Sequence, residues 1–156
     1  MDNIEITETF ESDDQFRKWF ELAKRPINKN KLDEELVEVT TLITEIQDIR
    51  DGLYSSTMQD DLEFTLWESR QYMTIKHNPR EWGITRVSND AIERTIKTLK
   101  NYQSYMGLLV SKRSMDNKYK GLLKSLYTRK EVLISLVSLF RASYYNESPA
   151  VYVENE

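Results

Sequence analysis

Basic side chains are concentrated in one stretch of this 156-residue sequence, and such a cluster is the chemistry that neutralises phosphate groups. Between Arg94 and Lys130 there are ten Lys or Arg residues and one acid, Asp116. This 37-residue stretch carries a net charge of +9, and because the whole chain carries −4 the remainder carries −13. Three interpretations are open: the bases bind nucleic acid, they bind an acidic protein or the chain's own acidic N-terminal half, or they form a solvated helix face.

Tyrosines lie among these bases, and the spacing of the bases predicts two groups on helical faces. A cationic groove with aromatic platforms is how proteins hold single strands without reading their sequence. Tyr102 and Tyr119 fall on the predicted apolar seam, where we expect them to pack, whereas other tyrosines lie nearer the polar face. The predicted nucleic-acid-binding residues are Arg94, Lys97, Lys100, Tyr105, Lys112, Arg113, Lys120, Lys124 and Tyr127.

The sequence has no motif typical of an enzyme. His77 is the single histidine, and there is neither a Gly-rich phosphate loop nor a nucleophile elbow. Asp60, Asp61 and Glu63 form an acidic group at the start of a predicted helix, where the helix dipole explains them. Cysteine is absent, which excludes disulfides and thiolate metal sites. We therefore expect no catalytic residue, no metal and no cofactor, and a binding protein instead of an enzyme.

Composition predicts an all-α fold. Four glycines and three prolines leave few turns, and a β-rich fold would need more of both. No run approaches the roughly 18 apolar residues that span a bilayer, so we expect no membrane association. The first residues are acidic, whereas a secretory signal begins with positive charge. These features predict a cytoplasmic protein, in the host cytoplasm if a phage encodes it.

Hydrophobic spacing predicts three shorter helices followed by one long C-terminal helix. Residues 1–15 are an acidic tail, residues 16–146 a single helical domain and residues 147–156 a C-terminal tail. The shorter helices are expected from Asp13 or Asp14 to Ala23, over 31–54 with Gly52 as its stop signal, and over 58–76. Pro26 follows the first, Trp82 is expected to fold back onto an apolar surface, and Ser88 is expected to cap the long helix.

The long C-terminal helix spans residues 89–145, but its two apolar seams are out of step between Ser111 and Lys118. Either a stutter bends one continuous helix or a turn at 111–121 folds it into a hairpin. We favour one helix, roughly 85 Å long at 1.5 Å per residue. A helix of that length cannot bury its stripe inside one small domain, so the prediction is coiled-coil-like packing in a homo-oligomer.

Three segments resemble the UvsY family of bacteriophage recombination mediators. They are Ser88-Asn-Asp-Ala-Ile92, Lys100-Asn-Tyr-Gln-Ser-Tyr105 and a long amphipathic helix with Lys124-Ser-Leu-Tyr-Thr-Arg129. Upstream, Ile49-Arg50-Asp-Gly-Leu-Tyr54 resembles the family's basic and aromatic end of the preceding helix. The resemblance covers residues 32–142 and rests on helical pattern and a few side chains.

The resemblance implies a helical, ring-forming protein that binds single-stranded DNA, contacts a single-strand-binding protein and helps to load a RecA-like recombinase. It also implies that Arg50 matches the family's basic DNA-contact motif, but here Asp48 and Asp51 flank Arg50. We therefore expect the DNA contacts on the long helix instead. An alternative from another class is a helical adaptor, inhibitor or scaffold that binds a basic partner through its acidic face.

Overall fold

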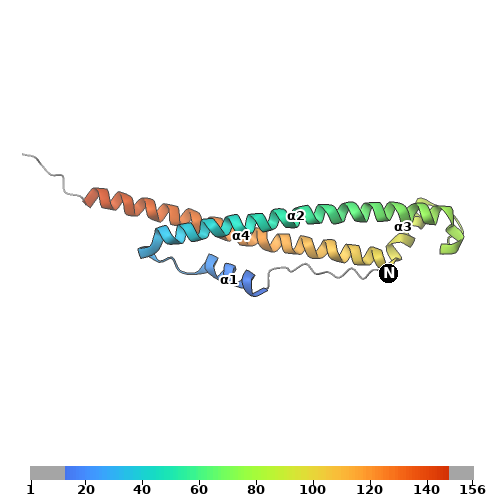
Figure 1. Ribbon diagram of the computed structural model, residues 1–156, viewed down its shortest axis with the longest axis horizontal. Helices are drawn as coiled ribbons and strands as arrows, with labels where there is room; N and C mark the ends of the chain where they lie inside the picture. Colours follow the sequence, from blue (N-terminus) through green and yellow to red (C-terminus); the bar gives the residue numbers. More distant parts are fainter. Residues whose placement is uncertain (1–12, 148–156) are drawn as a thin grey trace, which may run out of the picture. The chain divides into compact units, whose positions relative to one another are not determined.

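The computed structural model describes residues 13–147, and these form helices with no strand among them (Figure 1). The all-α prediction is thus confirmed. The order is α1 (Asp13–Lys24), the 3-10 helix η1 (Lys29–Lys31), α2 (Leu32–His77), the 3-10 helix η2 (Pro79–Trp82), α3 (Asn89–Thr98) and α4 (Lys100–Glu147). Most of the predicted acidic tail and nearly all of the C-terminal tail lie outside the described residues. Over the described part of the chain, no helix is long and apolar enough to cross a bilayer.

The chain divides into two compact units, and each long helix contributes to both. The terminal unit holds the described residues up to Gln47 together with those from Lys120 onward. The central unit runs from Asp48 to Tyr119. In the terminal unit the buried apolar side chains come from α1, α2 and α4; they are Trp19, Leu32, Val39, Leu42, Ile43, Ile46, Leu122, Leu123, Leu126 and Leu133.

Three predicted boundaries and contacts are confirmed. α1 ends at Lys24, just before Arg25 and Pro26. The Ser88 hydroxyl caps α3 by accepting a hydrogen bond from the Ala91 N–H at 3.2 Å. Trp82 folds back onto the apolar core of the central unit, which consists of Ile75, Ile84, Ile92 and Ile96.

α2 is one helix of 46 residues where two helices were predicted. The predicted stop at Gly52 and the new start at Met58 are wrong. A glycine ends a helix by adopting positive φ, and among the described residues only Gly83 does so, at 70°, where it caps η2. Gly52 stays helical at a cost of about 1 kcal/mol relative to alanine. Side chains on both sides of it, Arg50 and Ser56, bond to α4 and hold α2 in place.

The helix predicted over 89–145 is broken at Leu99, where the backbone is extended with φ −69° and ψ 138°. Ile92 and Ile96 before the break are each 1% exposed in the core of the central unit. In an unbroken helix they would lie about 80–140° around the axis from Tyr102 and Leu109. The break therefore lets both apolar faces turn toward the core, and no glycine or proline marks it.

From Lys100 onward α4 is one helix through residues 111–121, so the hairpin alternative is wrong. Its inward positions follow one heptad pattern, spaced alternately by three and four residues. The seam does not slip between Ser111 and Lys118, because the charged side chains of Lys112 and Asp116 occupy seam positions there and are buried or half-buried. The inward positions are Tyr105, Leu109, Lys112, Asp116, Tyr119, Leu123, Leu126, Lys130 and Leu133, and Leu122 and Arg129 beside them are buried as well.

The partner of α4 is α2 of the same chain. In the terminal unit Tyr127 bonds to Gln47 and Arg129 to Glu35. In the central unit Asp116 bonds to Arg50. The length of the C-terminal helix therefore does not by itself require helices from other copies, which was the premise of the predicted oligomer.

Candidate nucleic-acid interface

The predicted binding residues fall into three environments. Six basic side chains are exposed: Arg94, Lys97, Lys100, Arg113, Lys120 and Lys124. Tyr127 is 40% exposed, and Tyr105 is partly buried. Lys112 is buried. Most of the predicted bases are thus exposed. Of the nine predicted side chains, Lys112 is buried and Tyr105 is partly buried.

Lys112 was predicted to bind nucleic acid at the surface, and this prediction is wrong because the residue is buried. Its residue is 2% exposed, and its Nζ lies 2.6 Å from Asp60 Oδ2 and 2.5 Å from Ser56 Oγ, both on α2. A buried ammonium is tolerated only with such partners, because desolvation of an unpaired charge costs several kcal/mol. Lys112 therefore joins α4 to α2 within the central unit, and we leave it out of the interface.

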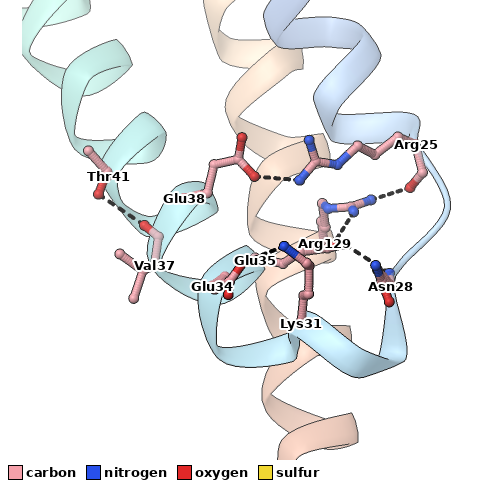
Figure 2. Close-up of polar contacts among 9 residues, drawn as sticks. All are labelled: Arg25, Asn28, Lys31, Glu34, Glu35, Val37, Glu38, Thr41 and Arg129. Atoms are coloured by element: carbon pink, nitrogen blue, oxygen red, sulfur yellow. Dashed lines mark hydrogen bonds and ion pairs between the residues drawn. The ribbon is translucent and has the colours of Figure 1, made fainter.

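Arg129, another base of the stretch, is also internal. In the terminal unit it is 6% exposed and donates to Glu35 Oε2 at 2.6 Å and to the backbone carbonyl of Arg25 (Figure 2). Glu35 also accepts the Asn28 N–H at 2.8 Å, and Arg25 pairs with Glu38. We call Arg25, Asn28, Glu35, Glu38 and Arg129 the Arg129 cluster. It joins the segment between α1 and α2 to the first turns of α2 and to α4.

Burial of Glu35 would raise its pKa, but other effects outweigh it. The hydrogen bonds from the Asn28 N–H and from Arg129, with the positive charges of Arg129 and Arg25, hold the pKa below its ordinary value of 4.5. The Glu35 carboxylate is thus ionised in the folded protein even below the pH at which it takes up a proton in the unfolded chain.

As the pH decreases below 4.5, the free energy of unfolding should decrease because Glu35 loses its stabilising contribution. There the unfolded chain binds a proton at Glu35 and the folded chain does not, so protonation favours unfolding, and the contribution is complete only above that pH. Urea unfolding from about pH 3 to about pH 7 checks this. The stability gap between the wild type and Glu35→Gln should shrink below 4.5; a gap that is constant with pH would contradict the assignment.

Asp116, the single acid of the basic stretch, is also engaged. Its Oδ1 accepts from Arg50 Nε at 2.7 Å in the central unit. The hydrogen bond to Asp116, opposed by burial and aided by the charges of Asp116 and Asp51, raises the pKa of Arg50 above its ordinary value. Arg50 is therefore held in a half-buried ion pair within the central unit.

Eight of the ten bases remain after Lys112 and Arg129 are set aside. Within the part of the chain that the structure describes, none of these eight forms an ion pair. They are Arg94, Lys97, Lys100, Arg113, Lys118, Lys120, Lys124 and Lys130. Among the described residues, the chain's own acids therefore neutralise Lys112 and Arg129 and form no ion pair with these eight.

In the terminal unit two of these bases share an exposed face of α4 with a tyrosine. Lys120, Lys124 and Tyr127 are four and three residues apart, so they lie within about 60° of one another around the helix. The Tyr127 hydroxyl accepts a hydrogen bond from Gln47 Nε2 at 2.6 Å, which fixes the ring. We call these three residues the Lys120 strip. Gln47 was not predicted, because it is 80 residues away in the sequence.

The bases of the central unit are less uniform in their surroundings. Arg113 lies one heptad before Lys120 in the same helix and borders a depression of about 370 Å³ with Tyr54 and Asn117. Lys118 lies about 160° around α4 from Lys120 and so faces another direction. On α3, Arg94 and Lys97 each follow an acid by four residues, Asp90 and Glu93, a spacing that places opposite charges side by side.

Tyr105 packs in an aromatic cluster of the central unit. Its ring centroid lies 5.6 Å from those of Phe64 and Trp67, and Tyr102 packs edge-on against Phe64 at 5.5 Å. Such contacts stabilise a core. Tyr119 is 3% exposed. The packing roles expected for Tyr102 and Tyr119 are confirmed, whereas Tyr105 joins them and is not a free stacking surface.

Fold and surface together define a class: a helical protein in which two long helices pair within one chain, and one of them displays bases that form no ion pair with any residue between 13 and 147. Comparison with family models, with curated proteins and with solved structures finds no match. The function is therefore argued from the geometry of this chain.

Proposed function

We propose that this protein binds single-stranded nucleic acid without catalysing a reaction, and that the Lys120 strip is central to the interface. The observation that carries the proposal is that two exposed ammonium groups, neither in an ion pair with a described residue, share one face of a helix with an exposed tyrosine ring. Lys120 and Lys124 neutralise successive phosphates, and Tyr127 offers its ring to a base that is not paired. A duplex has no unpaired base to offer, which favours the single strand.

The favourable free energy of binding comes mainly from counterion release: the lysines neutralise the phosphates, and the cations that were condensed on the strand go into solution. Arg113, Lys118 and the bases of α3 add charge that attracts the strand without fixing its register. The expected affinity of one chain is modest, because so few side chains make direct contact. The interface reads no sequence, since Lys120 and Lys124 meet only phosphate and stacking tolerates any base.

The biological role that we propose is that of an accessory to phage recombination or replication. Its support is the resemblance of residues 32–142 to recombination mediators of the UvsY family. In that role the protein holds single-stranded DNA, contacts a single-strand-binding protein and helps to load a RecA-like recombinase. Its place of action would be the cytoplasm of the host cell.

Reversal of the two lysines, Lys120→Glu with Lys124→Glu, should weaken binding to a single-stranded oligonucleotide by at least about tenfold near 0.1 M salt. Each lost phosphate contact also removes roughly 0.7 from the slope of log affinity against log salt, so two losses reduce the slope by about 1.4. Fluorescence anisotropy across salt concentrations measures both quantities.

The matched control is Lys18→Glu with Lys29→Glu, which reverses two exposed lysines of the same unit and changes the net charge equally. It should lower affinity only through the small change in overall charge. Equal loss in both double variants, or an unchanged salt slope in the first, would refute the Lys120 strip as the interface.

The alternative, a helical adaptor that binds a basic partner protein, rests on exposed acids of α2 such as Asp33, Glu34, Glu45 and Asp48. The same variants separate the two functions. An adaptor that acts through α2 should keep its partner when Lys120 and Lys124 are reversed, and should show no affinity for single strands in low salt.

A further inference from the structure

In the central unit α2 carries a second apolar face whose large side chains stay exposed among the described residues, 13–147. Leu62 lies about 160° around the helix from Asp60 on one side and from Phe64 on the other, and both of these face α4 or its neighbours. The outer stripe consists of Tyr54, Met58, Leu62, Leu66 and Met73, whose exposed fractions are 66, 56, 60, 50 and 52%. A helix that is apolar on two opposite faces is typical of the interior of an assembly.

The polar side chains within this face are already satisfied. Ser55, Thr65 and Ser69 each donate their hydroxyl to the carbonyl four residues earlier in α2, at 3.0, 2.8 and 2.9 Å. A partner can therefore cover them without leaving a buried donor unpaired, which would cost about 1–3 kcal/mol for each group. Their small size also lets a second helix approach closely.

We propose that this outer stripe pairs with the same stripe of a second copy of the chain, with the two α2 helices antiparallel. The charges beside the stripe support a second copy as the occupant. Glu63 and Arg70 lie on one flank, and Arg70 forms no ion pair with any described residue. A twofold axis between Thr65 and Leu66 brings Glu63 on this flank to within about 3 Å, measured along the helix, of Arg70 of the second copy, at a rise of about 1.5 Å per residue, and the symmetry repeats the contact for the other Glu63 and Arg70.

The same axis also sets the apolar side chains of the stripe opposite residues of the second copy that can accommodate them. Met58 meets Met73 of the second copy, and Leu62 meets Ser69 of the second copy. Such a self-complementary patch is what a twofold interface requires. A nucleic acid does not fit this face, because Asp61, Glu63 and Glu68 line it and would repel phosphate. The inference stands independently of the proposed function.

The test is the mass of the full chain in solution without nucleic acid, measured by sedimentation over a range of concentrations. The wild type should show a dimer or a larger even-numbered assembly. Leu62→Glu should raise its dissociation constant by at least about 30-fold, because a charge then lies at the centre of an apolar contact. Val110→Glu, which places the same charge at an exposed apolar residue of α4 in the same unit, should not.

Charge exchange tests the register. Glu63→Arg and Arg70→Glu should each weaken association about tenfold, since each disturbs two symmetry-related pairs, and the double exchange should restore it. Both side chains are exposed, so the fold of the chain tolerates the changes. A wild type of single-chain mass at every concentration, equal effects of Leu62→Glu and Val110→Glu, or no rescue by the double exchange would overturn the proposal. The variant with Lys120 and Lys124 reversed should keep the wild-type mass, so failure of the nucleic-acid interface and failure of this one are distinguishable.

Discussion

Replacing Arg129 with methionine should lower the free energy of unfolding by about 3–5 kcal/mol, the largest effect expected for one side chain of the basic stretch. Glu35 is only 5% exposed, and the variant leaves its carboxylate without the guanidinium partner. It also removes the Arg129 hydrogen bond to the Arg25 carbonyl. An uncompensated charge in that position is far costlier than the loss of apolar packing. Urea unfolding followed by circular dichroism at neutral pH measures the change.

Two comparisons make this result specific. Lys130→Met changes the next base along, which is only partly buried and has no ion pair among the described residues, and should alter stability by less than about 1 kcal/mol. Glu35→Leu combined with Arg129→Met should cost less than the sum of the single changes, by about 2 kcal/mol, because the two side chains interact. Strict additivity would show that the Arg129 cluster does not couple the helices.

Replacing Lys112 with methionine should lower the free energy of unfolding by about 3 kcal/mol and leave nucleic-acid binding by the folded protein unchanged. Its ammonium is the partner of Asp60, whose side chain is 18% exposed and therefore partly solvated, so the cost falls at the lower end for a broken buried pair. The affinity should not change, because Lys112 is 2% exposed and cannot reach a phosphate. Unfolding curves and anisotropy on the same sample separate the two effects.

Arg113→Met, at the next position, is the matched control with the opposite pattern. Arg113 is exposed and unpaired among the described residues, so its stability should change by about 0.5 kcal/mol or less while its affinity for single strands falls. Combining Lys112→Met with Asp60→Leu should recover most of the lost stability, since no buried charge is then left alone. If Lys112→Met weakened binding more than Arg113→Met, the internal role of Lys112 would be refuted.

The two kinds of base in this stretch could not be told apart from composition. Lys112 and Lys120 are the same residue type, eight positions apart in one helix, yet Lys112 occupies an inward position of the heptad and Lys120 an outward one. Reading only apolar residues as seam positions made the pattern seem to slip at Ser111–Lys118. A polar residue at an inward position fits the seam when the facing helix supplies its partner, as Asp60 and Ser56 do, and those partners are more than 50 residues away.

The sequence alone determined the class of fold, the cap at Ser88, the end of α1 before Pro26 and the concentration of charge between Arg94 and Lys130, because each depends on local propensity or on a count. Only the tertiary structure decided that α2 continues through Gly52, that the last helix breaks at Leu99 and which bases are displayed. These depend on contacts between residues far apart in the chain, whose energies exceed the roughly 1 kcal/mol of local preference that a single glycine or leucine expresses.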